Sequence, residues 1–244
     1  MHSIMALPPT YKTRLVKKEI FTHDTRDFTF DLLEPNVIDF KAGQFLLIKT
    51  TSPETGKMIS RAYSIASAPQ LTNQVVFNIE IVEGGQMTTL MDTWEIGTEI
   101  EMQGPFGHFV QKSEPTKDLI FVATGTGVAP MRSMIEDRLA EGSTQKIHLL
   151  FGVRCQDNIF YKELFEDLAE KYENFTFTLT LSRPKEGWEG STGRVTAILP
   201  ELDLDPTKTD AYLCGGKPMI DDVRQIFENK GFEASSVYFE QFFL

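Results

Sequence analysis

The chain has 244 residues, of which 41% are hydrophobic and 24% charged, a composition typical of a folded protein. Its formal net charge of −11 argues against general affinity for nucleic acid or an anionic membrane, which would require a basic face. Its two cysteines, Cys155 and Cys214, are too few to hold a zinc site or an iron–sulfur cluster through four thiolates.

The first residues, MHSIMALPPTYK, have neither the charged lead nor the long apolar region of a signal peptide. No hydrophobic run approaches the roughly 20 residues of a membrane span. The four histidines are scattered and form no metal-ligand motif. We therefore expect a cytoplasmic protein with reduced thiols, no membrane span and no bound metal.

The first half of the chain has short alternating or apolar runs separated by turn residues, with almost no helical periodicity. This pattern predicts an antiparallel β-barrel over residues 1–110. The expected strands are YKTRLVKKEIF, DFTFDLL, GQFLLIKT, RAYSIAS, VVFNIEIV and TEIEMQG. The GPFGHF turn and the polar QKSEPTKD segment then mark a domain boundary near residue 110.

One of these strands, RAYSIAS at residues 61–67, has an unusual composition. A period of two puts Arg61, Tyr63, Ile65 and Ser67 on one face. A guanidinium, an aromatic ring and hydroxyls among small apolar residues suit an anionic, planar ligand better than a plain sheet.

The second half, residues 111–244, alternates strands with helices and predicts a doubly wound, parallel, five-stranded α/β sheet. Helical spacing is found in PMRSMIEDRLAEG, NIFYKELFEDLAEKY and KPMIDDVRQIFENKG. The expected strands are Leu119–Thr124, Ile147–Val153, Phe177–Ser182, Ala211–Cys214 and Ser236–Glu240.

The leading strand of this half runs directly into GTGVAP, at residues 125–130, and then into a helix. A helix N-terminus beyond a strand end offers free N–H groups to phosphate, and Gly125 and Gly127 would let the backbone approach it closely. We therefore expect Gly125, Thr126, Gly127 and Val128 to bind a dinucleotide. The alternative is a tight strand-to-helix turn, since Pro130 stands where the usual fingerprint has its third glycine.

The ends of the next two strands carry basic side chains. Arg154 stands where a common NAD site has an acid, Ser182 and Arg183 end the following strand, and Arg194 comes shortly after. Together they predict a pocket for the 2′-phosphate of NADP(H). Any one of these arginines, taken alone, is more often a solvated surface charge.

The fourth strand of this half ends in CGGKPM, again with glycines before a helix start. We expect Cys214 to face the same crevice as GTGVAP, with Gly215 and Met219 beside the nucleotide. A buried cysteine is otherwise a small apolar filler.

Four motifs in this order, RAYS, GTGVAP, CGGKPM and the terminal Glu240-Gln241-Phe242, resemble the ferredoxin–NADP reductase family over about Tyr11 to the C-terminus. That resemblance implies a six-stranded antiparallel FAD barrel followed by a five-stranded parallel nucleotide domain, with FAD and NADP(H) as cofactors. It also implies that hydride passes between NADPH and FAD, and single electrons between FAD and a separate carrier.

The resemblance supplies the roles of individual residues. Arg61 would pair with the FAD pyrophosphate, Tyr63 would stack on the flavin and Phe242 would cover its other face. The helix start at Gly84 to Met91 would add N–H donors, although EGGQMTT also reads as a plain capped loop. The implied transfer positions are Ser64, Cys214 and Glu240, and the remaining implied FAD contacts are Ala62, Ile81, Gly85, Gln86, Met87 and Thr88.

The implied partner is a separate ferredoxin or flavodoxin, or an oxygenase component, and the implied state is a monomer or weak dimer. An acidic carrier would need a local basic patch, for which Lys17, Lys18, Lys41 and Lys57 are candidates.

Two alternatives stay open. Gly187-Trp188 is similar to some NADH-using reductases of multicomponent oxygenases, and a non-catalytic flavin- or nucleotide-binding subunit would regulate a partner complex.

Overall fold

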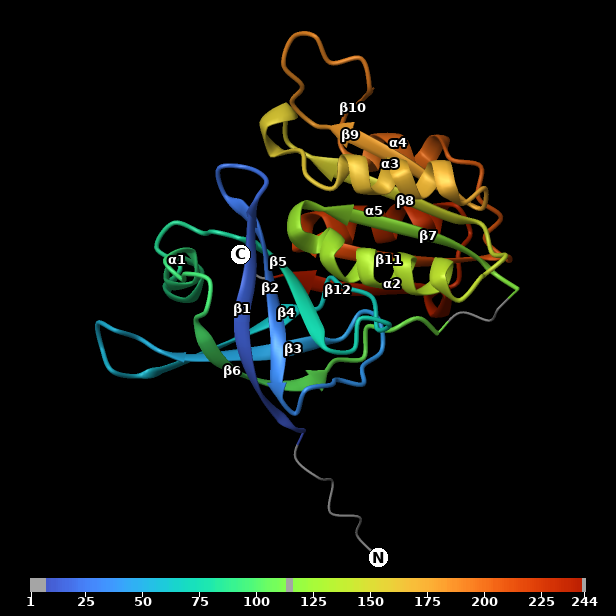
Figure 1. Cartoon of the computed structure of the whole chain (residues 1–244). Helices are drawn as coiled ribbons and strands as arrows, with labels where there is room; N and C mark the ends of the chain where they lie inside the picture. Colours follow the sequence, from blue (N-terminus) through green and yellow to red (C-terminus); the bar gives the residue numbers. More distant parts are fainter. Residues whose placement is uncertain (1–7, 113–115, 243–244) are drawn as a thin grey trace, which may run out of the picture.

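The structure, a computed structural model, describes residues 8–112 and 116–242 and consists of two domains that lie side by side (Figure 1). The predicted tail residues Phe243 and Leu244 and part of the predicted boundary segment lie outside the described residues. The first domain is a six-stranded antiparallel sheet with strand order β4-β3-β6-β1-β2-β5. Its elements are β1 (Thr10–Ile20), β2 (Thr25–Glu34), β3 (Phe45–Thr51), β4 (Met58–Ser64), β5 (Gln74–Glu80), α1 (Gln86–Asp92) and β6 (Glu99–Phe106).

The RAYSIAS strand is shorter than its sequence period predicts, because β4 ends at Ser64. Ile65 N still donates to Gln44 O of the segment before β3, at 3.0 Å, but Ala66 N donates to Val76 O of β5, at 2.8 Å. The chain therefore crosses from one neighbouring strand to the other at this point. That crossing links β4 to β5, the two ends of the sheet, and gives it its barrel form.

The second domain is a parallel sheet with strand order β10-β9-β8-β7-β11-β12. Five strands confirm the predicted doubly wound sheet, and a two-residue strand, β10, adds a sixth at the edge. The strands are β7 (Asp118–Thr124), β8 (Ile147–Val153), β9 (Phe175–Leu181), β10 (Ser191–Thr192), β11 (Thr209–Gly216) and β12 (Val237–Phe242). The helices are α2 (Val128–Ala140), α3 (Lys162–Lys171), α4 (Val195–Ile198) and α5 (Lys217–Asn229), with 3-10 turns η1 (Gly125–Gly127), η2 (Gln156–Asn158), η3 (Leu199–Glu201) and η4 (Ala234–Ser236).

Alternate strand residues of this sheet face two separate cores, as a sheet covered on both sides requires. Phe121 and Phe151 pack with α2 and α3 on one face, whereas Ile120 and Leu150 pack with α4 and α5 on the other. Figure 1 shows α2 and α3 in front of the sheet and α5 behind it. The predicted second helix starts late, at Lys162, because η2 and the left-handed residue Tyr161 come first.

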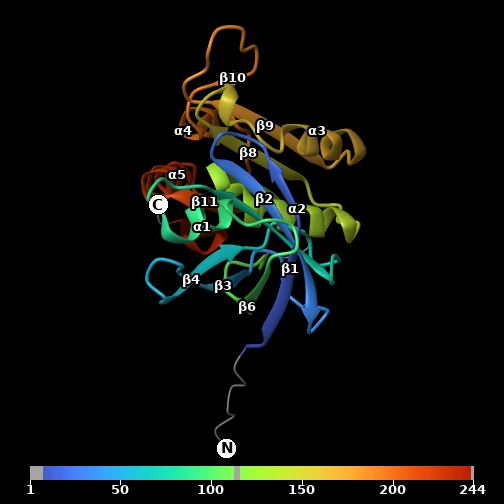
Figure 2. The ribbon, with the colours of Figure 1, turned by 60° about the vertical axis from the view of Figure 1, so that its left-hand side comes forward.

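Helix α2 forms much of the contact between the domains, and it lies next to the barrel in both ribbon views (Figures 1 and 2). Ala129 packs on Ala66 and Val76 of the barrel. One turn later, Ser133 Oγ donates to Ser67 O at 2.7 Å. No helix in the described part of the chain is long and apolar enough to cross a membrane.

Candidate cofactor and active site

A cavity of about 740 Å³ lies between the two domains and gathers residues from both. Its barrel side comes from β4, from β5 and from the loop that leads into α1, and its other side from the η1–α2 turn and the end of β12. Predicted site residues that line it are Arg61, Ala62, Tyr63, Ser64, Gly85, Gln86, Met87, Thr88, Thr126, Glu240 and Phe242.

Strand β4 places Tyr63 in this cavity with one edge fixed. Its ring meets Phe77 edge-on at a centroid distance of 6.5 Å, and burial raises its pKa to about 12, against a smaller opposing effect of Arg61. The hydroxyl is therefore neutral, and the ring presents an apolar face to the cavity. Arg61, two residues earlier, is exposed, and its Nη1 donates to the carbonyl oxygen of the neighbouring residue Ser60 at 2.9 Å.

Ser64 and Glu240 both line this cavity and join the two domains there. Ser64 Oγ donates to Glu240 Oε2 at 3.2 Å across 176 positions of sequence. Burial raises the pKa of Glu240, while the hydrogen bond from Ser64 lowers it. The parallel register pairs Glu240 with Cys214 on the neighbouring strand, so these three predicted transfer positions lie together.

The loop before α1 is held by its own side chains. Val82 N donates to Thr88 Oγ1 at 3.1 Å, which closes the loop across the start of the helix. A Cβ on Gly85 would lie 2.6 Å from Thr88 Oγ1 and 2.9 Å from Val82 O. The glycine is therefore needed for the loop itself, and the loop lines the cavity with Gln86 and Met87.

The GTG turn owes its second glycine to packing inside the protein. A Cβ on Gly127 would lie less than 3.0 Å from the Cys214 carbonyl group and from Gly215 N. The close approach that the sequence suggested is thus an approach to the end of β11. Gly125 has φ +54° and open space around its Cβ position, and Thr126 lines the cavity.

Cys214 is fully buried and belongs to the core that packs against α2 and α3. Burial, with a further contribution from the Glu240 carboxylate, raises the pKa of its thiol well above the usual range. The thiol is therefore neutral. Its side chain does not line the described cavity, so its contact with a nucleotide remains a prediction.

The predicted 2′-phosphate residues gather at the carboxyl ends of β8 and β9. Arg183 N donates to Arg154 O at 2.7 Å, and Gly193 N, next to Arg194, donates to Leu181 O at 2.8 Å. Ser182 and the three arginines are exposed. The pKa of the barrel residue Glu80 is raised by burial and by the charge of Asp24, against an opposing effect of the nearby Arg154 guanidinium.

Besides Gly125, Gly127, Cys214 and the residues at the ends of β8 and β9, further predicted contacts also lie outside the described cavity lining. Val128 is buried in the α2 core, Ile81 is half-buried beside the barrel core, and Met219 is half-buried in the first turn of α5. A Cβ on Gly215 would lie 2.5 Å from Met219 Cε, so these two pack on each other at the end of β11.

The candidate lysine patch is partly committed to internal contacts. Lys18 Nζ donates to the carbonyls of Asp92 and Trp94, at 2.8 and 3.1 Å, and Lys17 Nζ pairs with Glu19 at 2.5 Å. Lys41 and Lys57 are exposed.

Several cavity residues were not predicted from the sequence: Phe45, Asn78, Glu80, Val82, Ala129 and Gln241. Asn78 is the one with a sequence signal, an amide in the middle of the apolar strand VVFNIEI. An amide there needs a buried polar partner, and the structure supplies one in Asp27, whose Oδ1 accepts from Asn78 Nδ2 at 2.7 Å.

The donor set fits a flavin dinucleotide: two aromatic rings, an exposed guanidinium and a glycine-rich loop share one cavity. Residues 12–111 match the family described as the oxidoreductase FAD-binding domain, and residues 121–225 match the oxidoreductase NAD-binding domain. Fold and site therefore define an oxidoreductase that binds FAD and a nicotinamide dinucleotide.

Curated relatives agree with this class. Ferredoxin–NADP reductase B from Sorangium cellulosum is 32% identical over 88% of this chain and 90% of its own length. DmpP, the reductase component of phenol 2-monooxygenase from Pseudomonas sp., is 32% identical over 84% of this chain. The chain covers only 58% of DmpP.

Solved structures show the same fold. The cytochrome P450 reductase GcoB from Amycolatopsis has a TM-score of 0.86 and 22% identity over 97% of this chain and 71% of its own. A Neisseria gonorrhoeae ferredoxin–NADP+ reductase with bound FAD and NADP has a TM-score of 0.83 and 22% identity over 96% and 99%. The chain belongs to the ferredoxin–NADP reductase-like family of FAD- and NAD-binding oxidoreductases.

Proposed function

We propose that this protein transfers a hydride between NADPH and FAD, and single electrons between FAD and a separate ferredoxin or flavodoxin. The observation that carries the proposal is the cavity that both domains share. It sets Tyr63 and Phe242 in one space, with the Ser64–Glu240 hydrogen bond joining the domains there.

The chain's own residues would bind and orient the two dinucleotides and would exclude water from the space between them. Tyr63 and Phe242 would cover the ring system, Arg61 and the loop at Gly85 would hold the pyrophosphate, and the η1–α2 turn would hold the second dinucleotide. Bound FAD supplies the conversion between a two-electron donor and a one-electron acceptor. The Ser64 hydroxyl would lie next to the reacting ring, and Glu240 would accept its hydrogen bond.

The choice of NADPH rests on the basic residues Arg154, Arg183 and Arg194 at neighbouring strand ends, together with Ser182. NADH is the second candidate, in a reductase component that feeds an oxygenase. Two observations favour it: the similarity to DmpP, and the carboxylate of Glu80, which lies close enough to Arg154 for their charges to interact and would oppose a phosphate.

A separate carrier is proposed because this chain has two cysteines, too few for a four-thiolate cluster of its own. A reductase named for ferredoxin among the relatives supports the same assignment.

The first test is the absorption spectrum of the purified protein under anaerobic conditions, before and after NADPH or NADH. Bleaching of the flavin band by either dinucleotide supports hydride transfer, and a band that persists with both points to a non-catalytic binding subunit. Comparing kcat/KM for the two dinucleotides then decides between the candidates.

The same comparison tests one arginine. Arg183→Ala removes the proposed charge-assisted contact to the 2′-phosphate. It should therefore lower kcat/KM for NADPH by an amount equivalent to about 1–3 kcal/mol of transition-state stabilisation, and leave kcat/KM for NADH nearly unchanged. Equal losses with both dinucleotides would count against a phosphate pocket at Arg183.

A further inference from the structure

A buried carboxylate, Asp27 on β2, lies at the contact between the domains. It is 6% exposed. The Tyr161 hydroxyl donates to it, lying 2.6 Å from each carboxylate oxygen, and Arg132 Nη1 lies 3.3 Å from Oδ2. With Asn78 Nδ2 on Oδ1, one carboxylate joins β2 and β5 of the barrel to α2 and the start of α3.

Burying the charge of Asp27 and placing Tyr161 in a left-handed conformation both cost free energy, so the surrounding contacts must stabilise this cluster. A buried charge is unfavourable unless it is paired and hydrogen-bonded. Burial indeed raises the pKa of Asp27, together with the charge of Glu19, while Tyr161, Asn78 and Arg132 lower it. Tyr161 also has φ +59°, in the left-handed region that side chains rarely adopt, just before α3.

The packing around Tyr161 explains why that conformation persists. Its ring meets Phe160 and Phe21 edge-on, each at 5.3 Å, and the Arg132 guanidinium lies 4.8 Å from the ring centroid. These contacts aim the hydroxyl away from its own domain and at Asp27 of the barrel.

Neighbours of the cluster in both domains line the cofactor cavity. On the barrel side, Asn78 lines the cavity, and its Oδ1 has no hydrogen-bond partner among the described residues, so Asp27 is what orients the amide. On the other side, Arg132 follows Ala129 on α2 by about one turn, and Ala129 and Thr126 of the preceding η1 turn line the cavity. Asp27 therefore fixes the distance between the barrel wall and the phosphate-binding turn.

We propose that Asp27, with Tyr161 and Arg132, is a positioning cluster that sets the nicotinamide-to-flavin distance for hydride transfer. This inference rests on the proposed function. Loss of the Tyr161 hydroxyl leaves the buried carboxylate without its shortest hydrogen bond, so α2 and α3 move relative to the barrel. Misplacement by about 1 Å in such an arrangement costs up to about a hundredfold in rate.

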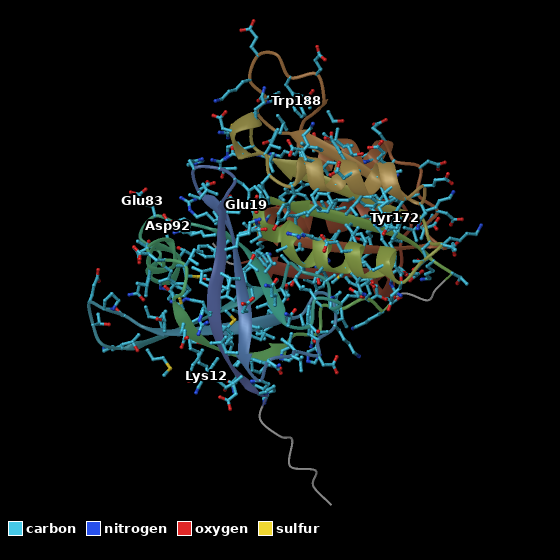
Figure 3. The ribbon with its side chains drawn as sticks, viewed as in Figure 1. Lys12, Glu19, Glu83, Asp92, Tyr172 and Trp188 are labelled. Carbon is cyan, nitrogen blue, oxygen red and sulfur yellow. The ribbon has the colours of Figure 1, made fainter. Side chains whose placement is uncertain are left out.

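The test compares Tyr161→Phe and Asp27→Asn with wild type and with Tyr172→Phe. Tyr172 lies at the other end of α3, far from the barrel (Figure 3), so its variant removes a hydroxyl from outside the cluster. Anaerobic stopped-flow reduction is followed at increasing concentrations of whichever dinucleotide the wild type prefers. We expect the limiting rate to fall at least about tenfold in both cluster variants, with the apparent Kd changed less than about twofold.

A second readout does not depend on turnover. Saturating oxidised dinucleotide perturbs the flavin absorption band when the nicotinamide lies against the ring. The amplitude of this difference spectrum should be smaller in Tyr161→Phe and Asp27→Asn, at wild-type FAD content, and unchanged in Tyr172→Phe.

The outcomes separate this inference from the proposed function. Wild type that neither dinucleotide reduces would overturn the proposed function itself. Wild type that is reduced, beside cluster variants with unchanged limiting rate and difference spectrum, would overturn only the positioning role. A rate loss fully explained by lost FAD, or one matched by Tyr172→Phe, would overturn it as well.

Discussion

At the scale of single residues, the cavity brings together side chains whose pKa values are raised by burial. Tyr63 and Glu240 lie on opposite sides of the domain contact, and burial raises the pKa of each. Burial therefore disfavours the phenolate of Tyr63 and the carboxylate of Glu240.

Replacing Tyr63 tests the stacking role. Tyr63→Ala removes the ring and should raise the Kd for FAD about tenfold, since an aromatic pair contributes about 0.5–1.5 kcal/mol beyond its buried area. Tyr63→Phe keeps the ring and is the control. Fluorescence titration of the FAD-free protein measures both, and an alanine variant that binds FAD like wild type would exclude stacking at this position.

Glu240 gives a prediction about pH. Its pKa is raised in the folded state, so its contribution to stability is present at low pH and is lost as pH rises through that raised pKa. Compared with Glu240→Gln, wild type should therefore lose free energy of unfolding as pH rises from about 4 toward 7. Denaturant unfolding across this range measures the difference, with Glu233→Gln, at an exposed position, as the control. A constant difference between wild type and Glu240→Gln would contradict the raised pKa.

At the scale of elements, the η1–α2 turn and the end of β11 are built against each other. Gly127 faces the Cys214 carbonyl group, and Gly215 faces Thr124 and Met219. Neighbouring parallel strands thus end in glycines that allow two loops to pack closely at one edge of the sheet, where doubly wound folds bind their ligands.

Gly127→Ala should therefore disturb both stability and nucleotide binding. The new Cβ would meet backbone atoms that cannot turn aside, so we expect a loss of about 1–3 kcal/mol in the free energy of unfolding and weaker dinucleotide binding. Gly216→Ala is the matched control, because its Cβ would be 3.9 Å from its nearest neighbour, Pro218 Cδ, which is an ordinary van der Waals contact. Thermal unfolding and dinucleotide titration distinguish the two, and equal effects would contradict the packing argument.

At the scale of the whole molecule, the net charge of −11 would govern the approach of the proposed carrier. Lys17 and Lys18, two of the candidate docking lysines, already have partners in the barrel. Long-range repulsion between this chain and an acidic ferredoxin or flavodoxin should therefore dominate at low salt.

Raising the ionic strength should then increase the rate constant for carrier reduction. The Debye length falls from about 30 Å at 0.01 M to about 10 Å at 0.1 M, which screens that repulsion. Stopped-flow mixing of reduced protein with an acidic carrier, repeated over this range, measures the effect. A rate constant that falls with salt would instead indicate a local basic docking patch.

Much of the fold was predictable because the hydrophobic periodicity of each strand and helix can be read from neighbouring residues. Alternation in the first half and strand–helix alternation in the second are written into neighbouring residues, and so are the glycine turns at strand ends. The two-residue strand β10 and the late start of α3 were not predicted, because each depends on contacts with distant segments.

The sequence alone determined the barrel, the doubly wound sheet and the motifs that mark a flavin and nucleotide site, since these follow from side-chain order along the chain. Tertiary structure decided what those motifs touch. It turned Gly127 toward Cys214, buried the cysteine, and joined Ser64 to Glu240 and Asp27 to Tyr161. The last two contacts link residues more than a hundred positions apart, and only the packing of one domain on the other brings them within hydrogen-bond distance.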